Sequence, residues 1–409
     1  MTTIGADPAC WLTETRSKVT CPATDEPASP LSDGDINKIV EQKLRSNNFR
    51  VSQWSLDIIG EPNGYLGQYY RLSVTVRVDD KSKSLKFFAK TPPPTSSPQY
   101  EFLTRYNTFN KEMLVYSDVI VRIGNGDGPK WSPDYYFGKP NTILVLEDAN
   151  HEGYVTPDKY VPFDEEHCIW LVKALSTLHS RSLILDEKLR RTGQTIQDLY
   201  GHLLEEVAFV ASDLVARKYL SSCTTGACTL VDMVEGWTEE EKTVVKKRIG
   251  RWIEGLPGLL VSSTKYRNLM CHRDIWPNNV MFKEDSTGKP IGCYLVDFQF
   301  LRYSPPAMDF VICLYLTTNR ATRSRCYDSF VQIYYDTMRQ QLAAEGLKVE
   351  ECFPLAEFRE SCKEYRQTAL TNMTFINYKK MDSENRKKLK FSVLDGRTPK
   401  NTMFHRKIV

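Results

Sequence analysis

The sequence predicts an α+β chain with two lobes, a small N-terminal lobe built on an antiparallel sheet and a large, mainly helical C-terminal lobe. Two observations support this: apolar and polar residues alternate over 70–78, as in a strand, and helical spacing of apolar residues dominates the second half. We place the N-lobe at 31–148 and the C-lobe at 149–409. The Thr-, Pro-, Ala- and Ser-rich segment 1–30 is expected to be disordered.

The N-lobe is predicted to begin with a helix and to continue into a β-hairpin. The helix starts at Ser32, and its apolar residues fall on one stripe: Ile36, Ile39, Val40 and Leu44. The strand at 70–78 turns at 79–83 into a second alternating strand that ends on Lys90. The hairpin therefore places a lysine at the end of a strand.

A second N-lobe helix is predicted after a break rich in Pro and Ser at 92–98. Apolar residues spaced alternately four and three apart from Phe102 to Ile120 form one face of this helix, and Glu112 lies at its edge. An apolar strand at 141–148 then ends in acidic residues. We interpret this strand as the connection between the two lobes.

The C-lobe is predicted to begin with a helix that has acidic residues at its start, 164–166. Two apolar stretches at 280–282 and 291–296 flank a polar turn and predict a second hairpin. Further helices are expected to about residue 380. The basic tail that follows is interpreted as a solvated end, with binding to anionic lipid or a nuclear address as alternatives.

Composition argues against several classes of function. The net charge of +3 gives no general basis for binding nucleic acid, and no apolar run is long enough to span a bilayer. The chain start lacks a secretory signal pattern and the 11 cysteines show no disulfide framework, so we expect a cytoplasmic protein without stable membrane insertion. Cys223 and Cys228 flank a Thr-Thr-Gly-Ala loop with no second pair at zinc spacing, so no zinc site is predicted. The oligomeric state stays open.

The stretch HRDIWPNN at 272–279 has the H-R-D-x-x-x-x-N spacing of a catalytic loop for phosphoryl transfer. Such a reaction needs Mg²⁺ against the phosphates, a cation on them, and a carboxylate that takes the acceptor's proton. Candidates for each role occur in the expected chain order. They are Lys90 with Glu112 as its partner, Asp274 as the base, and Asn279 and Asp297 as oxygen ligands of Mg²⁺.

Each of these residues also has a structural interpretation when it is taken alone. Lys90 could end a solvated strand, Glu112 could lie on a solvated helix face, and Asp297 could begin a turn. The combination is more specific than its members. A catalytic-loop spacing, a short hairpin and an apolar strand that ends in Asp-Phe are hard to explain by packing alone.

Two residues near the motif are interpreted as structural. For His272 we favour a role in which the ring hydrogen-bonds the loop. Asp309 could cap a helix that begins at Phe310, but we favour support of the catalytic loop, including a link to His272 or Arg273.

The residues around the motif differ from those of protein kinases. Gln299 follows Asp297 and Phe298 where a protein kinase has Gly, and no A-P-E motif comes after it. The glycines at 60, 64 and 67 form a looser loop than G-x-G-x-x-G-x-V. The chain is therefore not predicted to phosphorylate proteins.

The motifs resemble those of the ecdysteroid kinase-like family, a branch of the choline kinase and aminoglycoside phosphotransferase group with a bilobal protein-kinase-like fold. CHRDIWPNNVMF at 271–282 resembles its signature CHGDLWxNNxMF, and LVDFQ at 295–299 matches its LVDFQ. Three further segments are similar to its lysine strand, glutamate helix and hinge strand: FAKTP at 88–92, FNKEMLVY at 109–116 and LVLED at 144–148. The resemblance extends from about residue 35 to 380. Arg273, where the family usually has Gly, and Pro277 depart from it.

This resemblance implies ATP-dependent phosphorylation of a hydroxyl group on a small molecule, an ecdysteroid or a related steroid or xenobiotic alcohol. It implies that Mg²⁺ is a cofactor and that adenine hydrogen-bonds to the backbone between Glu147 and Ala149. The implied roles of the other residues are those inferred above: Lys90 and Glu112 at the phosphates, Asp274 as base, Asn279 and Asp297 at Mg²⁺.

Two alternatives stay open. One is a choline- or ethanolamine-type kinase, which needs an aromatic and acidic pocket for a quaternary ammonium group. The other is an inactive, ligand-binding pseudokinase. The second is disfavoured because all five polar positions are intact.

Overall fold

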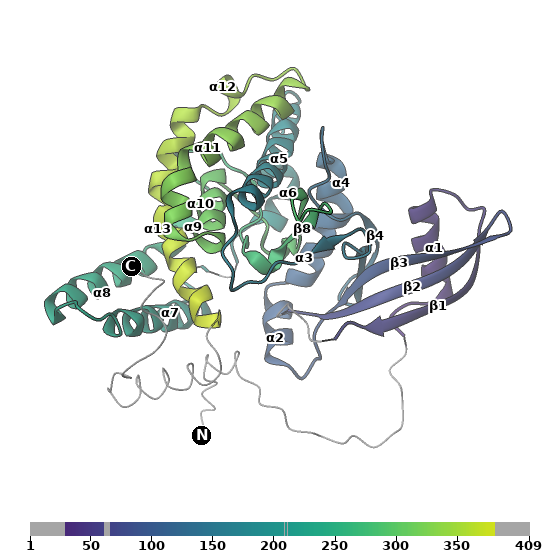
Figure 1. Ribbon diagram of the computed structural model, residues 1–409, viewed down its shortest axis with the longest axis horizontal. Coiled ribbons are helices and arrows are strands. Elements are labelled where there is room, and N and C mark those ends of the chain that lie inside the picture. Colours follow the sequence, from purple (N-terminus) through teal and green to yellow (C-terminus); the bar gives the residue numbers. More distant parts are fainter. Residues whose placement is uncertain (1–28, 61–65, 208, 211, 381–409) are drawn as a thin grey trace.

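The structure is a computed structural model that describes residues 29–60, 66–207, 209–210 and 212–380. The N-terminal residues 1–28 and the basic tail 381–409 lie outside the described residues, so a disordered start and a solvated tail stay predictions. The described residues form a small sheet-rich lobe and a larger helical lobe (Figure 1). This is the predicted α+β, two-lobed architecture.

The N-lobe is built on an antiparallel sheet that has, within the described residues, five strands in the order β1-β2-β3-β5-β4. They are β1 (Arg50–Ile58), β2 (Gln68–Val78), β3 (Lys81–Thr91), β4 (Tyr135–Lys139) and β5 (Ile143–Glu147). The predicted hairpin is confirmed as β2 and β3. The sequence pattern does not predict β1, since a register shift between Val51 and Gln53 interrupts its alternation.

Helix α1 (Asp33–Leu44) packs on this sheet through its apolar stripe. Its predicted start is confirmed, because Ser32 is the N-cap and exchanges hydrogen bonds with Asp35 in a capping box. The stripe shares one hydrophobic core with alternate residues of β2 and β3: Ile36, Ile39, Val40, Leu72, Val74, Val76, Leu85 and Phe87. This core holds β3, and therefore the strand end that carries Lys90, in place.

The prediction of one helix from 102 to 120 is wrong, because the segment is broken. It forms α2 (Pro98–Arg105), α3 (Thr108–Leu114), the π-helical turn η2 (Val115–Val119) and α4 (Ile120–Ile123). Asn107 has a φ of 49°, a left-handed conformation that interrupts the helix and that Asn tolerates. The apolar spacing survives the break, so Glu112 still lies on α3 and faces the protein interior.

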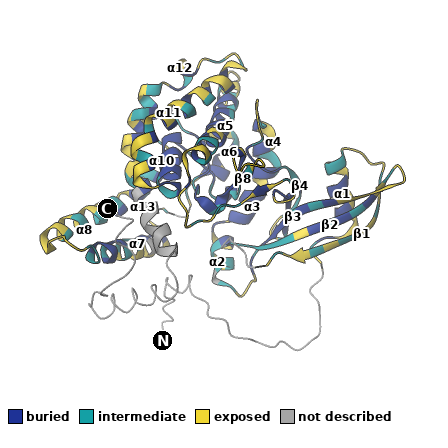
Figure 2. Cartoon of the chain, in the orientation of Figure 1, coloured by how far each residue is buried: buried dark blue, intermediate teal, exposed yellow. Residues whose placement is uncertain are grey.

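The C-lobe is mainly helical, as predicted, and its core contains α10, which Figure 2 shows as buried. Its helices are α5 (Glu165–Arg190), α6 (Ile196–Leu204), α7 (Leu214–Asp232), α8 (Glu239–Glu254), α9 (Leu256–Leu260), α10 (Pro306–Thr317), α11 (Arg320–Ala343), α12 (Val349–Cys352) and α13 (Leu355–Lys380). Asp164 caps α5, which confirms the acidic start of this helix. None of the described helices combines the length and the apolar character needed to cross a bilayer.

The loop predicted between Cys223 and Cys228 is wrong. Both residues lie inside α7, and the intervening Gly226 is accommodated in the helix, where a single glycine costs only about 1 kcal/mol. The nine cysteines within the described part of the chain are free thiols. This agrees with the absence of a disulfide framework in the sequence.

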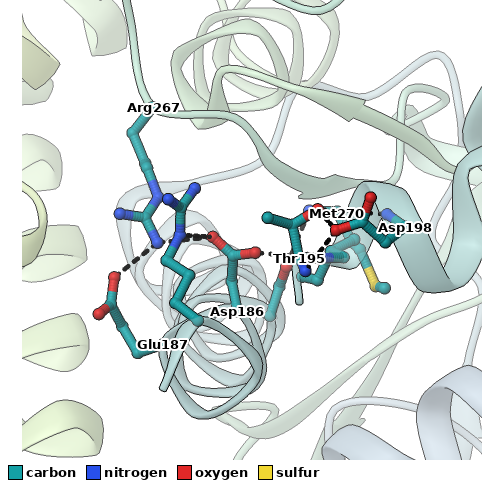
Figure 3. A network of polar contacts seen from close by, with 9 residues as sticks. Asp186, Glu187, Thr195, Asp198, Arg267 and Met270 are labelled. Atoms are coloured by element: carbon teal, nitrogen blue, oxygen red, sulfur yellow. Dashed lines mark hydrogen bonds and ion pairs between the residues drawn. The ribbon is translucent and has the colours of Figure 1, made fainter. Parts of the chain in front are cut away.

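A polar network anchors the segment that leads into residues 272–279 (Figure 3). The carboxylate of Asp186, at the end of α5, is fully buried and accepts hydrogen bonds from Arg267 (2.6 Å), Arg190 (2.9 Å) and the amide of Ile196 (3.1 Å). Arg267 also contacts Glu187 at 2.6 Å. Two residues after Arg267, the chain enters β7 (Leu269–Cys271), so the network ties α5 and α6 to the strand before the catalytic loop.

Candidate active site

The site is assembled at one end of a β-hairpin in the C-lobe, β8 (Val280–Glu284) and β9 (Pro290–Leu295). This confirms the predicted second hairpin. Asn279 immediately precedes β8, and Asp297 follows β9 by two residues. The amide of Val296 donates a hydrogen bond to the carbonyl oxygen of Asn279 at 3.1 Å. The hairpin therefore brings the two predicted metal ligands to the same end of the sheet.

Lys90 connects this hairpin to the N-lobe. Its Nζ atom lies 2.6 Å from Oε2 of Glu112 on α3 and 3.3 Å from Oδ1 of Asp297. Lys90 is 3% exposed and Glu112 is 2% exposed, so the solvated interpretation of both residues is wrong. One ammonium group thus bridges two carboxylates that come from different lobes.

Burial and neighbouring charges shift the pKa values of Lys90 and Glu112 in opposite directions. Burial lowers the pKa of Lys90, but the carboxylates of Asp297 and Glu112 outweigh that effect and hold the pKa well above its usual value. Burial raises the pKa of Glu112, and the charge of Lys90 offsets this only in part. Two carboxylates share one cation, so the cluster is suited to accept a further cation such as a metal ion.

The catalytic-loop residues Asp274 and Asn279 contact each other directly. Nδ2 of Asn279 donates to the backbone oxygen and to Oδ2 of Asp274, both at 2.9 Å. The 3-10 turn η3 (Pro277–Asn279), with Pro277 at its first position, sets this geometry. Because the side-chain nitrogen Nδ2 of Asn279 is engaged, the side-chain oxygen Oδ1 is the atom left to bind a hard cation.

His272 holds the loop to the hairpin, as predicted. The ring of His272 is fully buried and contacts backbone atoms through both of its nitrogens. Nε2 lies 2.9 Å from the carbonyl oxygen of Val296, and Nδ1 lies 3.3 Å from the amide nitrogen of Asp274. The Asp274 amide can only donate, so Nδ1 accepts and Nε2 carries the proton. Burial lowers the pKa of His272, which keeps this neutral tautomer.

Asp309 does not cap a helix that begins at Phe310, because α10 begins at Pro306 and has Pro305 as its N-cap. Its carboxylate instead accepts hydrogen bonds from the amides of His272 (2.5 Å) and Arg273 (2.9 Å). The favoured interpretation, support of the catalytic loop, is therefore confirmed. Burial alone would raise the pKa of Asp309, but its hydrogen bond to His179 and nearby positive charge lower it.

His179, Cys271 and Asp309 also form a compact buried group whose possible ligand atoms lie within 4.8 Å of one another. Their contacts explain them without a metal ion. His179 bonds to Tyr334 and Asp309, Cys271 donates to the carbonyl oxygen of Ser304, and burial raises the pKa of the Cys271 thiol well above its usual value. We interpret the group as the support beneath the catalytic loop.

Sequence reasoning missed the contacts made by residues next to Asp297. Nε2 of Gln299, which occupies the place of the glycine in protein kinases, donates to Oδ2 of Asp297 at 3.3 Å. Phe298 packs edge-on against Tyr116 of η2, with ring centroids 5.3 Å apart. Asp297 itself has a φ of 67°. The sequence around Asp297, an apolar strand followed by Asp-Phe, gives no indication of this left-handed backbone conformation.

The connection between the lobes runs from β5 to the short strand β6 (Tyr154–Val155). The side chain of Glu147 bonds to Lys130 and Tyr294, and its amide donates to the oxygen of Asp134 at 2.8 Å. The carbonyl of Ala149 accepts from the amide of Tyr154 at 2.8 Å. The Glu147 side chain therefore has a structural role, and no described residue accepts from the Ala149 amide.

Comparison with models of known protein families identifies one family that this chain matches. A family model described as the ecdysteroid kinase-like family matches residues 61–347, more than half of the chain. No curated protein matches the sequence.

Three similar solved structures are a phosphotransferase and two small-molecule kinases by their descriptions. An aminoglycoside phosphotransferase in complex with GDP and kanamycin is 13% identical, covers 81% of this chain and 98% of its own, and has a TM-score of 0.38. A microcompartment-associated aminopropanol kinase is 11% identical, with 87% and 93% covered and a TM-score of 0.37. A glucosamine kinase with glucosamine, ADP and inorganic phosphate is 13% identical, with 85% of both chains covered and a TM-score of 0.32. Scores this low do not by themselves establish a shared activity.

Proposed function

The chain belongs to the ecdysteroid kinase-like family, and we propose that it is an ATP-dependent kinase that phosphorylates a hydroxyl group of a small molecule. The bridge from Glu112 through Lys90 to Asp297 is the observation that supports this most strongly. Phosphoryl transfer in protein kinases uses a lysine held by a glutamate near a metal-binding aspartate. A purely structural lysine does not need two carboxylates from two lobes, one of them buried and the other partly exposed.

The residues present fit Mg²⁺. Asn279 and Asp297 offer hard oxygen donors at the same end of the hairpin, and the hydrogen bond between Nδ2 of Asn279 and Asp274 leaves the side-chain oxygen Oδ1 of Asn279 for the metal. When bound, Mg²⁺ would neutralise charge that develops on the phosphates. Lys90 would contact the phosphates while Glu112 keeps its ammonium group in place.

The nucleotide base would lie against the connection between the lobes. The amide of Ala149 and the carbonyl of Glu147 would bond to adenine through the backbone, whereas the Glu147 amide is already engaged by Asp134. A small apolar cluster next to this segment would form the floor under the base: Ala149, Tyr154, Met281, Tyr294 and Val296. Because these bonds to adenine would come from the backbone, they depend little on which side chains residues 147 and 149 carry.

Asp274 would take the proton of the acceptor hydroxyl. Its carboxylate is oriented by Asn279, and its backbone amide is held by His272, so the base is positioned before the acceptor binds. By family membership the acceptor would be an ecdysteroid or a related steroid or xenobiotic alcohol. The site would act in the cytoplasm, where ATP and Mg²⁺ are both abundant and free thiols are stable.

A transfer assay tests this proposal. The purified full chain, Mg²⁺ and ATP labelled on the γ-phosphate are incubated with hydroxylated steroids, other lipophilic alcohols and choline, and labelled products are identified by mass spectrometry. We expect a labelled steroid or related alcohol, and label formed at least about a hundredfold more slowly with Asp274→Asn. Binding of nucleotide without transfer to any alcohol would favour a pseudokinase, and label on choline alone would favour the choline-type alternative.

A further inference from the structure

Three cationic side chains lie together beside the catalytic loop, and none of them has a role in the proposed reaction. We call them the cation cluster: Lys111 on α3, Arg273 in the loop and Arg302 on β10 (Arg302–Ser304). The carbonyl oxygen of Leu301 accepts hydrogen bonds from both Lys111 and Arg302. Arg302 also pairs with Glu206 at 3.3 Å. The carboxylate of Glu206 opposes the charges of Lys111 and Arg302, and the carboxylate of Asp309 lies near the charge of Arg273.

Arg273 is incompletely satisfied. Its Nε and Nη1 atoms are buried, and no described residue accepts a hydrogen bond from either of them. Burying a charged donor without an acceptor is unfavourable, because the donor loses its bonds to water and gains none in the protein. Arg273 also has a φ of 69°, a conformation that favours glycine, and glycine is the residue expected here from the family motif. An arginine therefore stands at a position where its backbone conformation is strained and two of its side-chain donors have no acceptor.

The surroundings of Lys111 disfavour its charged form. Its pKa is lowered to about 6, first by burial and then by the charges of Arg302 and Arg273, while Glu206 acts in the opposite direction. The groups that face it thus come from the catalytic loop, from β10 and from the segment after α6. An anion placed here would satisfy Arg273 and restore the charge of Lys111.

The nucleotide phosphates are not this anion. Lys111 and Glu112 are neighbours on α3, and consecutive helical residues point about 100° apart around the axis. Glu112 faces Lys90, whereas Lys111 bonds to the carbonyl oxygen of Leu301, four residues beyond Asp297 in the chain. The cluster is therefore next to Asp274 in the chain but separate from the lysine expected to hold phosphates.

We propose that the cation cluster binds an anionic group of the acceptor, so that the substrate is an acidic alcohol that carries a carboxylate, sulfate or phosphate near the hydroxyl. This rests on the proposed function and narrows its substrate class. The same positive charge would repel a quaternary ammonium group, so it disfavours choline as acceptor.

The first test compares two acceptors that differ only in charge. A hydroxylated steroid acid and its methyl ester are assayed as phosphate acceptors, with saturating MgATP. We expect the KM of the acid to be lower by about tenfold, the effect of one charge-assisted hydrogen bond. Arg273→Gly, which suits the backbone at this position, should remove that difference. Lys289→Met, which removes an exposed lysine paired with Glu166, should retain it.

The second test does not require turnover. Sulfate is titrated calorimetrically into the full chain with Mg²⁺ and a non-hydrolysable ATP analogue, which occupies the nucleotide site. We expect binding that Arg273→Gly weakens at least about tenfold. Proton uptake at pH 7, measured as a dependence of the heat on buffer ionisation enthalpy, should occur in the parent protein and disappear in Lys111→Met.

The outcomes separate this inference from the proposed function. Transfer of phosphate with equal KM for acid and ester would overturn the acidic acceptor and leave the kinase proposal intact. Sulfate binding that is lost in Arg273→Gly, without transfer to any alcohol, would support the anion site and contradict the kinase. Sulfate binding with equal KM values would assign the cluster to a free anion and overturn its role in acceptor choice.

Discussion

Lys90 and Glu112 form a buried ion pair in which Nζ and Oε2 are 2.6 Å apart, and Asp297 completes it at the longer distance of 3.3 Å. The two carboxylates differ in accessibility, because the Glu112 side chain is 3% exposed and the Asp297 side chain 20% exposed. The closer, less accessible partner is suited to hold the lysine permanently. The more accessible Asp297 is suited to exchange the lysine for a metal ion.

The first prediction concerns Asp297. Asn is the substitution to use, because it tolerates the φ of 67° found here, whereas Ala would add backbone strain. Asp297→Asn should weaken MgATP binding at least about tenfold, since it replaces a charged ligand of Mg²⁺ by a neutral one. Calorimetry with and without Mg²⁺ measures this. Affinity for metal-free ATP should change less, and equal MgATP affinity in both proteins would remove Asp297 from the metal site.

The second prediction concerns Asp274. Asp274→Asn keeps an oxygen that can accept the hydrogen bond from Nδ2 of Asn279, so the loop should stay in place. Turnover should fall by about 10²–10⁴, the usual contribution of a positioned base. Steady-state kinetics give turnover, and calorimetry should show unchanged MgATP affinity. A variant with near-normal turnover would show that another group takes the proton.

The polar centre of the site could be predicted from the sequence because each residue sits at a recognisable junction. Lys90 ends an alternating strand, Asp297 ends an apolar one, and Asn279 closes a loop with a fixed spacing. Strand alternation and loop spacing are local properties. They place side chains at element ends before any tertiary contact is known.

The surroundings of that centre could not be predicted, for two physical reasons. Asp309 and Lys111 act through partners far away in the chain: Asp309 bonds to His272 and Lys111 to Leu301. Such pairings are decided by tertiary packing: the sequence allows either a helix cap or support of the loop for Asp309, of which the favoured second is confirmed, and nothing in the sequence singles out Lys111. Backbone irregularities are the second reason. The left-handed Asn107 and the π turn η2 break a helix whose apolar spacing is continuous.

The third prediction concerns Asp309 as a positioning residue. Asp309→Asn would direct an NH₂ group at one of the two amides that the carboxylate now accepts from, those of His272 and Arg273. We expect a loss of about 1–3 kcal/mol in the free energy of unfolding, the cost of an unsatisfied buried donor. Turnover should fall while the KM for ATP is retained, because the loop shifts and the nucleotide site does not.

Its control is Asp336→Asn on α11, an aspartate with a 51% exposed side chain. That variant should match the parent protein in both thermal unfolding and kinetics. If Asp309→Asn lowered stability without affecting turnover, the carboxylate would support the fold and not the orientation of the catalytic loop.

The fourth prediction concerns stability and pH at Lys111. Its pKa falls from 10.5 to about 6 in the folded protein, so between these values the unfolded chain binds one more proton than the folded chain. The contribution of Lys111 to the free energy of unfolding must therefore rise with pH between about 6 and 10.5, by up to about 1.4 kcal/mol per pH unit. The effect is a destabilisation, fully present below the folded pKa and relieved as pH approaches the unfolded one.

Lys111→Met fills the same buried space without a titrating group, and the carbonyl of Leu301 keeps its bond from Arg302 at 2.9 Å. At pH 7 this variant should be more stable than the parent protein by roughly 1–4 kcal/mol, and the advantage should shrink as pH rises to 9. Urea unfolding at pH 6, 7, 8 and 9, followed by circular dichroism, gives both curves. Because the two proteins share every other titrating group, the difference between their free energies of unfolding reports on Lys111 alone. If that difference did not change with pH, the ammonium group of Lys111 would be balanced by its neighbours in the folded protein. The cation cluster would then have no positive charge left for an anion to neutralise.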